Sequence, residues 1–273
     1  MLSFLKKLLF IFIRKLERYP YFILLILNNI NNFSFFLPHD KDYYGIKLIF
    51  KRESVDGCFV DVGANTGTSY LGFRKLGFAN KIYLFEPNYF LFEKYLKNFK
   101  KKNQDISIYN LALGSINKKF FFYIPFIGKT MIHYFSGFNK NYVKKSCLNT
   151  FPEKKIFLKK KLLKIKKFDD LKIKDNVAFV KIDTEGYDLE VIKGMKKTIV
   201  KYCPVSLIEY NPELQKKVVK LLKNYLQYYY NIKNNSLVKI KNLNKKNFDR
   251  FGHDNSLSVR NIFFIHRDKL KLL

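Results

Sequence analysis

The chain has 273 residues, 48% of them apolar, so it can bury a large core and is not a disordered protein. Its net charge of +30 would attract polyanions, but nearly all of the excess is lysine, in a sequence also rich in Asn, Ile, Phe and Tyr. That composition is typical of an AT-rich genome, so we interpret the charge as a solvated lysine-rich surface and do not expect nucleic acid as a partner. Three cysteines, Cys58, Cys147 and Cys203, are too few and too far apart for a disulfide framework or a metal site.

The first forty residues form a candidate extension to the rest of the chain. Two strongly apolar runs, 8–13 and 21–27, are separated by charged residues, whereas a bilayer-spanning helix needs about 20 nearly uncharged residues. Basic residues interleaved with Leu and Phe are typical of a helix at a membrane surface, but also of an amphipathic helix that caps a domain. We predict an extension over residues 1–40 and one domain over 41–273. Contact of residues 1–37 with the inner face of the membrane, in an otherwise cytoplasmic protein, is a hypothesis.

Beyond the extension, short apolar runs alternate with helical patterns, which predicts an α/β domain with a mostly parallel sheet and helices on both faces. Between Pro125 and Pro152 we expect a long loop, of the kind that often carries substrate specificity. The expected strands cover residues 58–62, 81–85, 106–111, 118–124, 162–168, 176–182, 205–208 and 262–265. The expected helices cover residues 68–76, a segment after Asn88, a short segment from Asp169, 189–195 and 212–228.

The first expected strand runs into a glycine-containing turn and then a helix, in the segment Phe59–Gly67. Glycine lets backbone N–H groups approach a ligand closely at a helix N-terminus. Only two glycines are present, with Asn65 between them, which is a poor match to the G-x-G-x-x-G spacing of dinucleotide-binding turns. Asp61, two residues before the first glycine, suits a cationic ligand instead. S-adenosylmethionine carries a sulfonium and an ammonium group, so we predict a site for this cofactor; an ordinary structural turn is the alternative.

An acidic residue, Glu86, closes the second expected strand. It follows the glycine turn by about 20 residues, and a carboxylate at this place in such a sheet can accept hydrogen bonds from both ribose hydroxyls. The turn and Glu86 together therefore predict an adenosine site. NAD enzymes share this carboxylate, so Glu86 does not by itself choose the cofactor.

A second strand–turn–helix segment, Val180–Gly194, places two carboxylates at the end of a buried strand. Open α/β sheets bind their ligands at the carboxyl ends of their strands, where Asp183 and Glu185 stand. Glu185 and Asp188 have an alternative role, since a carboxylate can also cap the helix that follows. Asp183 ends the strand and has no helix to cap. The sequence indicates no role for Lys181.

Two segments together resemble the FkbM family of class I methyltransferases, namely F-V-D-V-G-A-N-T-G and F-V-K-I-D-T-E-G-Y-D-L-E-V-I-K-G-M. Asn110–Gly114 and Ile165–Leu171 are similar to that family's intervening blocks, so the resemblance covers roughly Cys58 to Asn211. In this family asparagine is usual at the place of Asn65. The resemblance implies a Rossmann-like class I methyltransferase fold, with a mostly parallel seven-stranded sheet and a reversed terminal hairpin.

The same resemblance implies S-adenosyl-L-methionine as the cofactor and O-methylation, often of glycan or polyketide hydroxyls. We therefore expect a bacterial O-methyltransferase that acts on a sugar hydroxyl of a surface glycan or its precursor. The predicted cofactor-binding residues are Asp61, Gly63, Ala64, Asn65, Thr66, Gly67, Glu86, Pro87, Asn88, Asn110 and Ala112.

Methyl transfer to a sugar hydroxyl needs a base, because the hydroxyl is a weak acid and loses its proton as the new bond forms. Asp183 and Glu185 are the predicted catalytic residues, either as that base or as ligands of a sugar diol. His133 is a third candidate, and Glu209 and Asn211 are expected to line the acceptor pocket. No metal is expected.

Two other functions stay open. The basic charge would suit an RNA methyltransferase, but base N-methylation commonly uses an Asn/Asp-Pro-Pro-aromatic loop, and Asp183–Gly186 stands at the corresponding place. A non-catalytic, membrane-associated scaffold of the same fold is the second alternative. A salt-sensitive gel shift would favour the first, and a lack of cofactor binding would favour the second.

Overall fold

The computed structural model describes residues 41–50, 55–102, 105–241 and 260–273. The predicted extension over residues 1–40 lies outside this range. The described chain divides into two compact units, one from Phe121–Lys161 and a larger one from the described parts of Pro38–Phe120 and Leu162–Leu273. Within the described ranges, none of the helices combines the length and the apolar character that crossing a bilayer demands.

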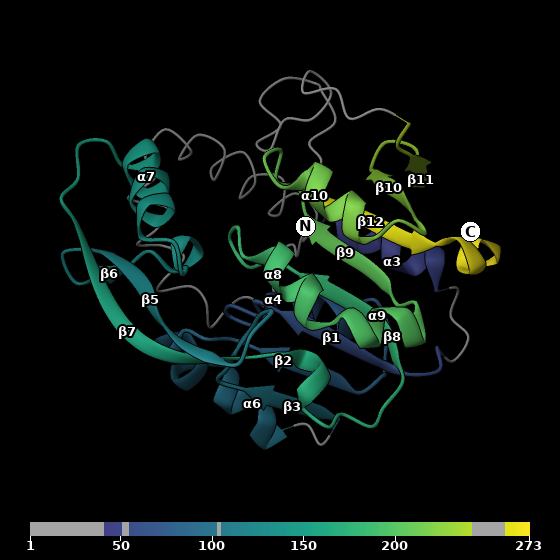
Figure 1. The fold of residues 1–273 in the computed structure, drawn as a ribbon, viewed down its shortest axis with the longest axis horizontal. Coiled ribbons are helices and arrows are strands. Elements are labelled where there is room, and N and C mark those ends of the chain that lie inside the picture. The colour runs from purple at the N-terminus through teal and green to yellow at the C-terminus, as the bar shows by residue number, and fades with distance from the viewer. Residues whose placement is uncertain (1–40, 51–54, 103–104, 242–259) are drawn as a thin grey trace, which may run out of the picture. The chain divides into compact units, whose positions relative to one another are not determined.

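The larger unit is built on an eight-stranded sheet with the strand order β11-β10-β12-β9-β8-β1-β2-β3 (Figure 1). Strands β3, β2, β1, β8 and β9 pair in parallel, and β12, β10 and β11 continue the sheet as antiparallel neighbours. This arrangement confirms the predicted α/β class with a reversed terminal hairpin; β11 adds one strand to the seven expected. The strands are β1 Cys58–Val62, β2 Ile82–Phe85, β3 Ile106–Tyr109, β8 Val177–Ile182, β9 Val205–Glu209, β10 Tyr225–Asn231, β11 Ser236–Lys239 and β12 Asn261–His266.

Helices cover both faces of this sheet, as predicted, because the central strands are apolar on both sides. Successive side chains of β1 alternate between the faces. Phe59 packs against Phe73 and Phe179 on the face that α3 and α4 cover, and Val60 joins Val191 on the face of α8 and α10. The helical segments are η2 Lys41–Tyr43, α3 Tyr44–Ile49, α4 Thr68–Lys75, α5 Tyr89–Leu91, the π-helical η3 Phe92–Leu96, α6 Lys97–Lys102, η5 Phe168–Asp170, α8 Asp188–Gly194, α9 Lys196–Tyr202, α10 Gln215–Leu221 and η7 Arg267–Leu272.

One predicted helix is wrong over its second half. The expected helix at 212–228 is α10, which ends at Leu221, followed by strand β10 from Tyr225. Tyrosine-rich sequences favour strands, and the ladder of hydrogen bonds between β10 and β12 decides the conformation. The consequence is that the chain reverses here and forms the antiparallel edge of the sheet.

The smaller unit replaces the long loop that we predicted between Pro125 and Pro152, so that prediction is wrong as well. This stretch contains strand β6 Thr130–Met131, the 3-10 turn η4 His133–Phe135 and helix α7 Lys140–Thr150. The chain enters this stretch through strand β5 Lys118–Ile127 and leaves it through strand β7 Ile156–Lys166. These strands belong to a sheet ordered β4-β7-β5-β6, in which β4 Ala112–Leu113 is part of the larger unit. The unit has a small core of its own, made of Ile127, Ile132, Val143, Cys147 and Phe151.

Candidate functional site

The turn between β1 and α4 adopts the positive φ angles that its glycines permit. Gly63 and Gly67 have φ angles of 85° and 84°, and Asn65 adopts the left-handed region with φ 50°. The backbone N–H groups of Gly63 and Ala64 both donate to the carbonyl oxygen of Phe85, at 3.0 and 3.1 Å. The turn is thus fastened to the end of β2, the neighbouring strand.

The turn also lies directly against the end of β8. The backbone N–H of Asp183 donates to the carbonyl oxygen of Val62 at 3.0 Å. A Cβ atom placed on Gly63 would lie 1.8 Å from the carbonyl oxygen of Asp183, so no other residue fits at this position without moving the backbone. The two motifs singled out in the sequence therefore form one continuous surface at the carboxyl end of the sheet.

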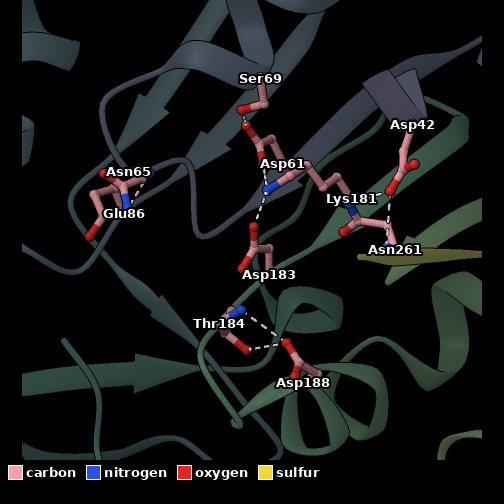
Figure 2. Close-up of polar contacts among 10 residues, drawn as sticks. All are labelled: Asp42, Asp61, Asn65, Ser69, Glu86, Lys181, Asp183, Thr184, Asp188 and Asn261. Carbon is pink, nitrogen blue, oxygen red and sulfur yellow. Dashed lines mark hydrogen bonds and ion pairs between the residues drawn. The ribbon is translucent and has the colours of Figure 1, made fainter. Parts of the chain in front are cut away.

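Glu86 is buried at the end of β2 and holds two loops together. Its carboxylate accepts hydrogen bonds from the backbone N–H of Asn65 at 2.8 Å and of Asn88 at 2.7 Å (Figure 2 shows the Asn65 contact). Burial raises the pKa of Glu86 to about 7, against the lowering effect of these two donors. A carboxylate offers about four acceptor positions, so lone pairs stay available for ribose hydroxyls. Its role in binding ribose stays a prediction.

Asn110 belongs to the same corner of the larger unit. Its side-chain amide donates to the carbonyl oxygens of Glu86 at 2.8 Å and of Pro87 at 3.2 Å. Thr66 and Ala112, also among the predicted cofactor-binding residues, are buried. The structure thus brings the ends of β2 and β3 together around the predicted adenosine site.

Asp61 is fully buried beneath the turn, and its surroundings are charged. The hydroxyl of Ser69 donates to one carboxylate oxygen, and the ammonium nitrogen of Lys181 lies 3.5 Å from the other (Figure 2). Burial raises the pKa of Asp61, and Lys181 counteracts that rise. The cation that Asp61 faces in the structure thus belongs to the chain itself. Lys181 also lies 3.2 Å from Asp183.

Three carboxylates meet at the ends of β8 and β9. Asp183, Glu185 and Glu209 each place an oxygen within 4.8 Å of the others, and all three residues are half-buried. This group could hold a cation, or accept hydrogen bonds from several hydroxyl groups of one ligand. Glu185 has a left-handed φ of 50°, a conformation that costs free energy outside glycine and that clusters at functional sites.

Asp188 locks the turn that carries these groups. Its carboxylate accepts from the backbone N–H of Thr184 at 2.9 Å and from the Thr184 hydroxyl at 2.7 Å (Figure 2). Asp188 is buried, and burial raises its pKa to about 6. These contacts fit the alternative in which Asp188 has a structural role, and they hold Thr184 of the turn.

Asn211 and His133, two further predicted site residues, make other contacts. The side-chain oxygen of Asn211 accepts from the backbone N–H of Glu213 at 3.0 Å and so stabilises the turn after β9. His133 belongs to the smaller unit, where its ring contacts Tyr134 edge-on at 5.3 Å. The carboxylate group belongs to the larger unit. Roles for both residues stay predictions.

Comparison with known proteins gives the family directly. The model of the methyltransferase FkbM domain matches residues 61–231, which is more than half of the chain and includes both motifs. The chain belongs to the FkbM methyltransferase family. Membership of a methyltransferase family implies S-adenosylmethionine as the methyl donor.

Solved structures similar to this FkbM protein include three methyltransferases. An FkbM methyltransferase from Methylobacillus flagellatus is 18% identical with a TM-score of 0.48, over 81% of this chain and 47% of that one. A precorrin-6y C5,15-methyltransferase from Geobacter metallireducens is 12% identical, with a TM-score of 0.38, over 84% and 88%. A ribosomal protein L11 methylase from Lactobacillus delbrueckii is 11% identical, with a TM-score of 0.38, over 84% and 78%. This chain thus spans about half the length of the first. Among curated proteins, none matches the chain.

The turn of this FkbM domain fits the implied cofactor. Within the described residues, the side-chain oxygen of Asn65 is buried and has no hydrogen-bond partner, so a donor from a ligand would satisfy it. The positive φ angles of Gly63 and Gly67 set the shape of the turn, and a Cβ atom on either glycine would meet Asp183 or Phe99 of the chain itself. Asn65, Glu86 and Asn110 are thus the residues that would hold S-adenosylmethionine.

The role of Lys181 became apparent only in the three-dimensional structure, whereas Glu209 was already predicted to line the acceptor pocket. Lys181 interrupts an otherwise apolar strand whose six residues are all buried. A lysine in such a strand is a signal by itself, because burying an ammonium group is costly unless carboxylates pair with it. Glu209 ends a strand that follows β8 in the sheet order, and only that order brings it to Asp183.

Proposed function

We propose that the protein transfers a methyl group from S-adenosylmethionine to a hydroxyl oxygen, on a sugar of a surface glycan or of its precursor. The observation that carries this proposal is the contact between the cofactor turn and a carboxylate edge, where Gly63 lies against Asp183. A cofactor held at the turn would then present its methyl group to an acceptor bound by Asp183, Glu185 and Glu209.

The reaction is a displacement at the methyl carbon, in which a carbon–oxygen bond forms as the carbon–sulfur bond breaks. S-adenosylmethionine, held by Asn65, Glu86 and Asn110, would supply the activated methyl group and would leave as S-adenosylhomocysteine. Asp183 takes the hydroxyl proton or orients the hydroxyl by accepting its hydrogen bond. Glu185 and Glu209 accept hydrogen bonds from neighbouring hydroxyls of the same ring, and this favours a polyhydroxylated acceptor over an apolar one.

A labelled-methyl assay tests the proposal. The purified protein receives S-adenosylmethionine labelled in the methyl group, together with bacterial envelope glycans, methyl glycosides or RNA in parallel. We expect label in the carbohydrate arms, on an ether oxygen. Label in the RNA arm would support the nucleic-acid alternative, which only the net charge of +30 favours. Binding without transfer in every arm would argue against the proposed acceptor.

Asp183→Asn is the matching variant. We expect turnover to fall by roughly 100-fold or more, since a base contributes about 10²–10⁴-fold to such reactions. The affinity for S-adenosylmethionine, measured by calorimetry, should stay within a few-fold of the wild type, because the cofactor contacts lie on the turn. Unchanged turnover would remove Asp183 from the catalytic residues.

A further inference from the structure

Lys181 is a charged side chain inside the core, and the sheet register explains its partners. It is 4% exposed and lies beside Asp61 of β1, its partner in the parallel pairing. Asp183 comes two residues later, directly after the end of β8. Its backbone N–H still donates to Val62 of β1, and residues two apart in a strand point to the same side. The ammonium nitrogen lies 3.5 Å from an Asp61 oxygen and 3.2 Å from an Asp183 oxygen (Figure 2).

The two carboxylates do not need Lys181 in the same way. Asp61 is completely buried, so its charge requires a partner inside the protein. The Asp183 side chain is 37% exposed, and water alone could solvate it. The need to neutralise a buried charge therefore explains the contact of Lys181 with Asp61, but not its shorter contact with Asp183.

The contact between Lys181 and Asp183 lies beside two further carboxylates. Glu185 and Glu209 each place a carboxylate oxygen within 4.8 Å of an Asp183 oxygen, and like charges this close repel one another. Burial lowers the pKa of Lys181, but Asp183 and Asp61 raise it well above its usual value, so the side chain stays cationic. The Lys181 ammonium group beside Asp183 offsets this repulsion and limits the rotation of the Asp183 side chain.

We propose that Lys181 is a positioning residue, which holds the Asp183 carboxylate directed toward Glu185 and Glu209 while it is anchored to Asp61 beneath the cofactor turn. This inference rests on the proposed function for its catalytic meaning. Whether Lys181 orients the Asp183 side chain can be tested without any acceptor.

A comparison of Lys181→Met with the double variant Lys181→Met/Asp61→Asn separates positioning from stability. The single variant leaves Asp61 buried without its cation, so its stability in urea should fall. The double variant removes that unpaired charge, and its stability should return most of the way to that of Asp61→Asn. If Lys181 only balanced Asp61, activity would return with stability.

If Lys181 positions Asp183, activity stays low in the stable double variant. We expect the release of S-adenosylhomocysteine, with methyl glycosides as the acceptor probe, to be roughly 10- to 100-fold slower than in Asp61→Asn. Lys181→Arg keeps the charge and should retain more of the activity than Lys181→Met. A double variant as fast as Asp61→Asn would overturn the proposal.

Crystal structures of Asp61→Asn and of the double variant distinguish a failure of the Lys181 proposal from a failure of the proposed function. We expect the Asp183 carboxylate of the double variant to move by about 1 Å or to occupy several rotamers. An unmoved Asp183 would overturn the role of Lys181, even if the enzyme methylates sugars. A wild type that binds no S-adenosylmethionine in calorimetry would instead contradict the proposed function, and the crystal structures would still decide the role of Lys181.

Discussion

Gly63 joins the two halves of the candidate site, and its substitution tests that junction. A Cβ atom there would lie 1.8 Å from the carbonyl oxygen of Asp183, and its φ of 85° disfavours any side chain. We expect Gly63→Ala to lower the free energy of unfolding by about 3 kcal/mol or more and to abolish cofactor binding. Urea denaturation and calorimetry measure the two effects.

Gly77 is the matched control for this prediction. Its φ of 92° is similarly unfavourable for alanine, but a Cβ atom there would have no neighbour within 4 Å. Gly77→Ala should therefore cost only the backbone strain, about 1 kcal/mol, and leave cofactor affinity unchanged. Equal losses in the two variants would show that the contact between Gly63 and Asp183 does not matter.

We expect Glu86, as the predicted ribose ligand, to make cofactor binding depend on pH. Its pKa is raised to about 7 by burial, and ribose hydroxyls would donate to the ionised form. We expect the affinity for S-adenosylmethionine to rise roughly tenfold between pH 6 and pH 8, because below the pKa binding must first release a proton. Calorimetry across this range measures it, and Glu86→Gln should bind weakly at every pH. A wild-type affinity that is flat with pH would contradict the prediction.

The raised pKa of Glu86 makes folding stability fall as the pH rises, which is opposite to its expected effect on cofactor affinity. The folded protein holds the Glu86 proton more tightly than the unfolded chain, so this contribution to stability is full below about pH 4.5 and is lost as the pH rises through about 7. Because the bound cofactor favours the ionised form, it should reduce this loss. The burial of Glu86 thus links the fold and the ligand.

Single residues were predictable where chemistry marks them in the sequence. Gly63, Glu86 and Asp183 follow recognisable strands, and the structure places them at one edge of the sheet. Lys181 could not be assigned a role, because its partner Asp61 is 120 positions away in the chain and only the register of β1 on β8 joins them. A side chain's role depends on such pairings when its partners belong to other strands.

Elements were predictable where their pattern has only one interpretation. The five parallel strands were expected close to their observed limits, since continuous apolar runs between turn residues predict buried strands. The tyrosines of β10 also fit a helical period, and pairing with β12 decides between the two. In α7, Val143 and Cys147 recur at helical spacing after the cap Asn139, a signal that the surrounding lysines obscured.

Helix α8 tests how closely the second motif packs within the larger unit. A Cβ atom on Gly194, the last residue of α8, would lie 2.0 Å from the carbonyl oxygen of Gly114. Alanine gains about 1 kcal/mol in helix propensity, but overpacking against a fixed backbone costs about 1–3 kcal/mol. We expect the contact to prevail, so Gly194→Ala should be destabilised in urea.

Val200 in α9 provides the control for α8. Its side chain is 71% exposed, so Val200→Ala changes helix propensity with little loss of packing, and we expect a change within about 0.5 kcal/mol. A stabilised Gly194→Ala would show that α8 can move away from Gly114. The turn that carries Asp183 and Glu185 would then be less rigid than its hydrogen bonds indicate.

The whole molecule carries 52 basic and 22 acidic side chains, and this excess repels itself in the compact state. Salt screens such repulsion, since the Debye length falls from about 30 Å at 0.01 M to about 8 Å at 0.15 M. Salt also weakens exposed ion pairs such as Lys97–Glu93 and Lys193–Glu190, but each of these is worth at most about 1 kcal/mol. With a net charge of +30, we expect repulsion to outweigh the pairs.

Added sodium chloride should therefore stabilise the protein. Between 0.01 M and 0.15 M we expect the melting temperature to rise by about 2–4 °C, which corresponds to roughly 1 kcal/mol for a chain of this size. Thermal unfolding followed by circular dichroism measures it. A comparison of sodium sulfate with sodium chloride at equal ionic strength separates general screening from binding of an anion. General screening gives similar melting temperatures in the two salts, whereas a specific anion site would raise the melting temperature at millimolar sulfate. A melting temperature that falls with salt would mean that ion pairs, and not the excess of lysine, dominate the electrostatics of the fold.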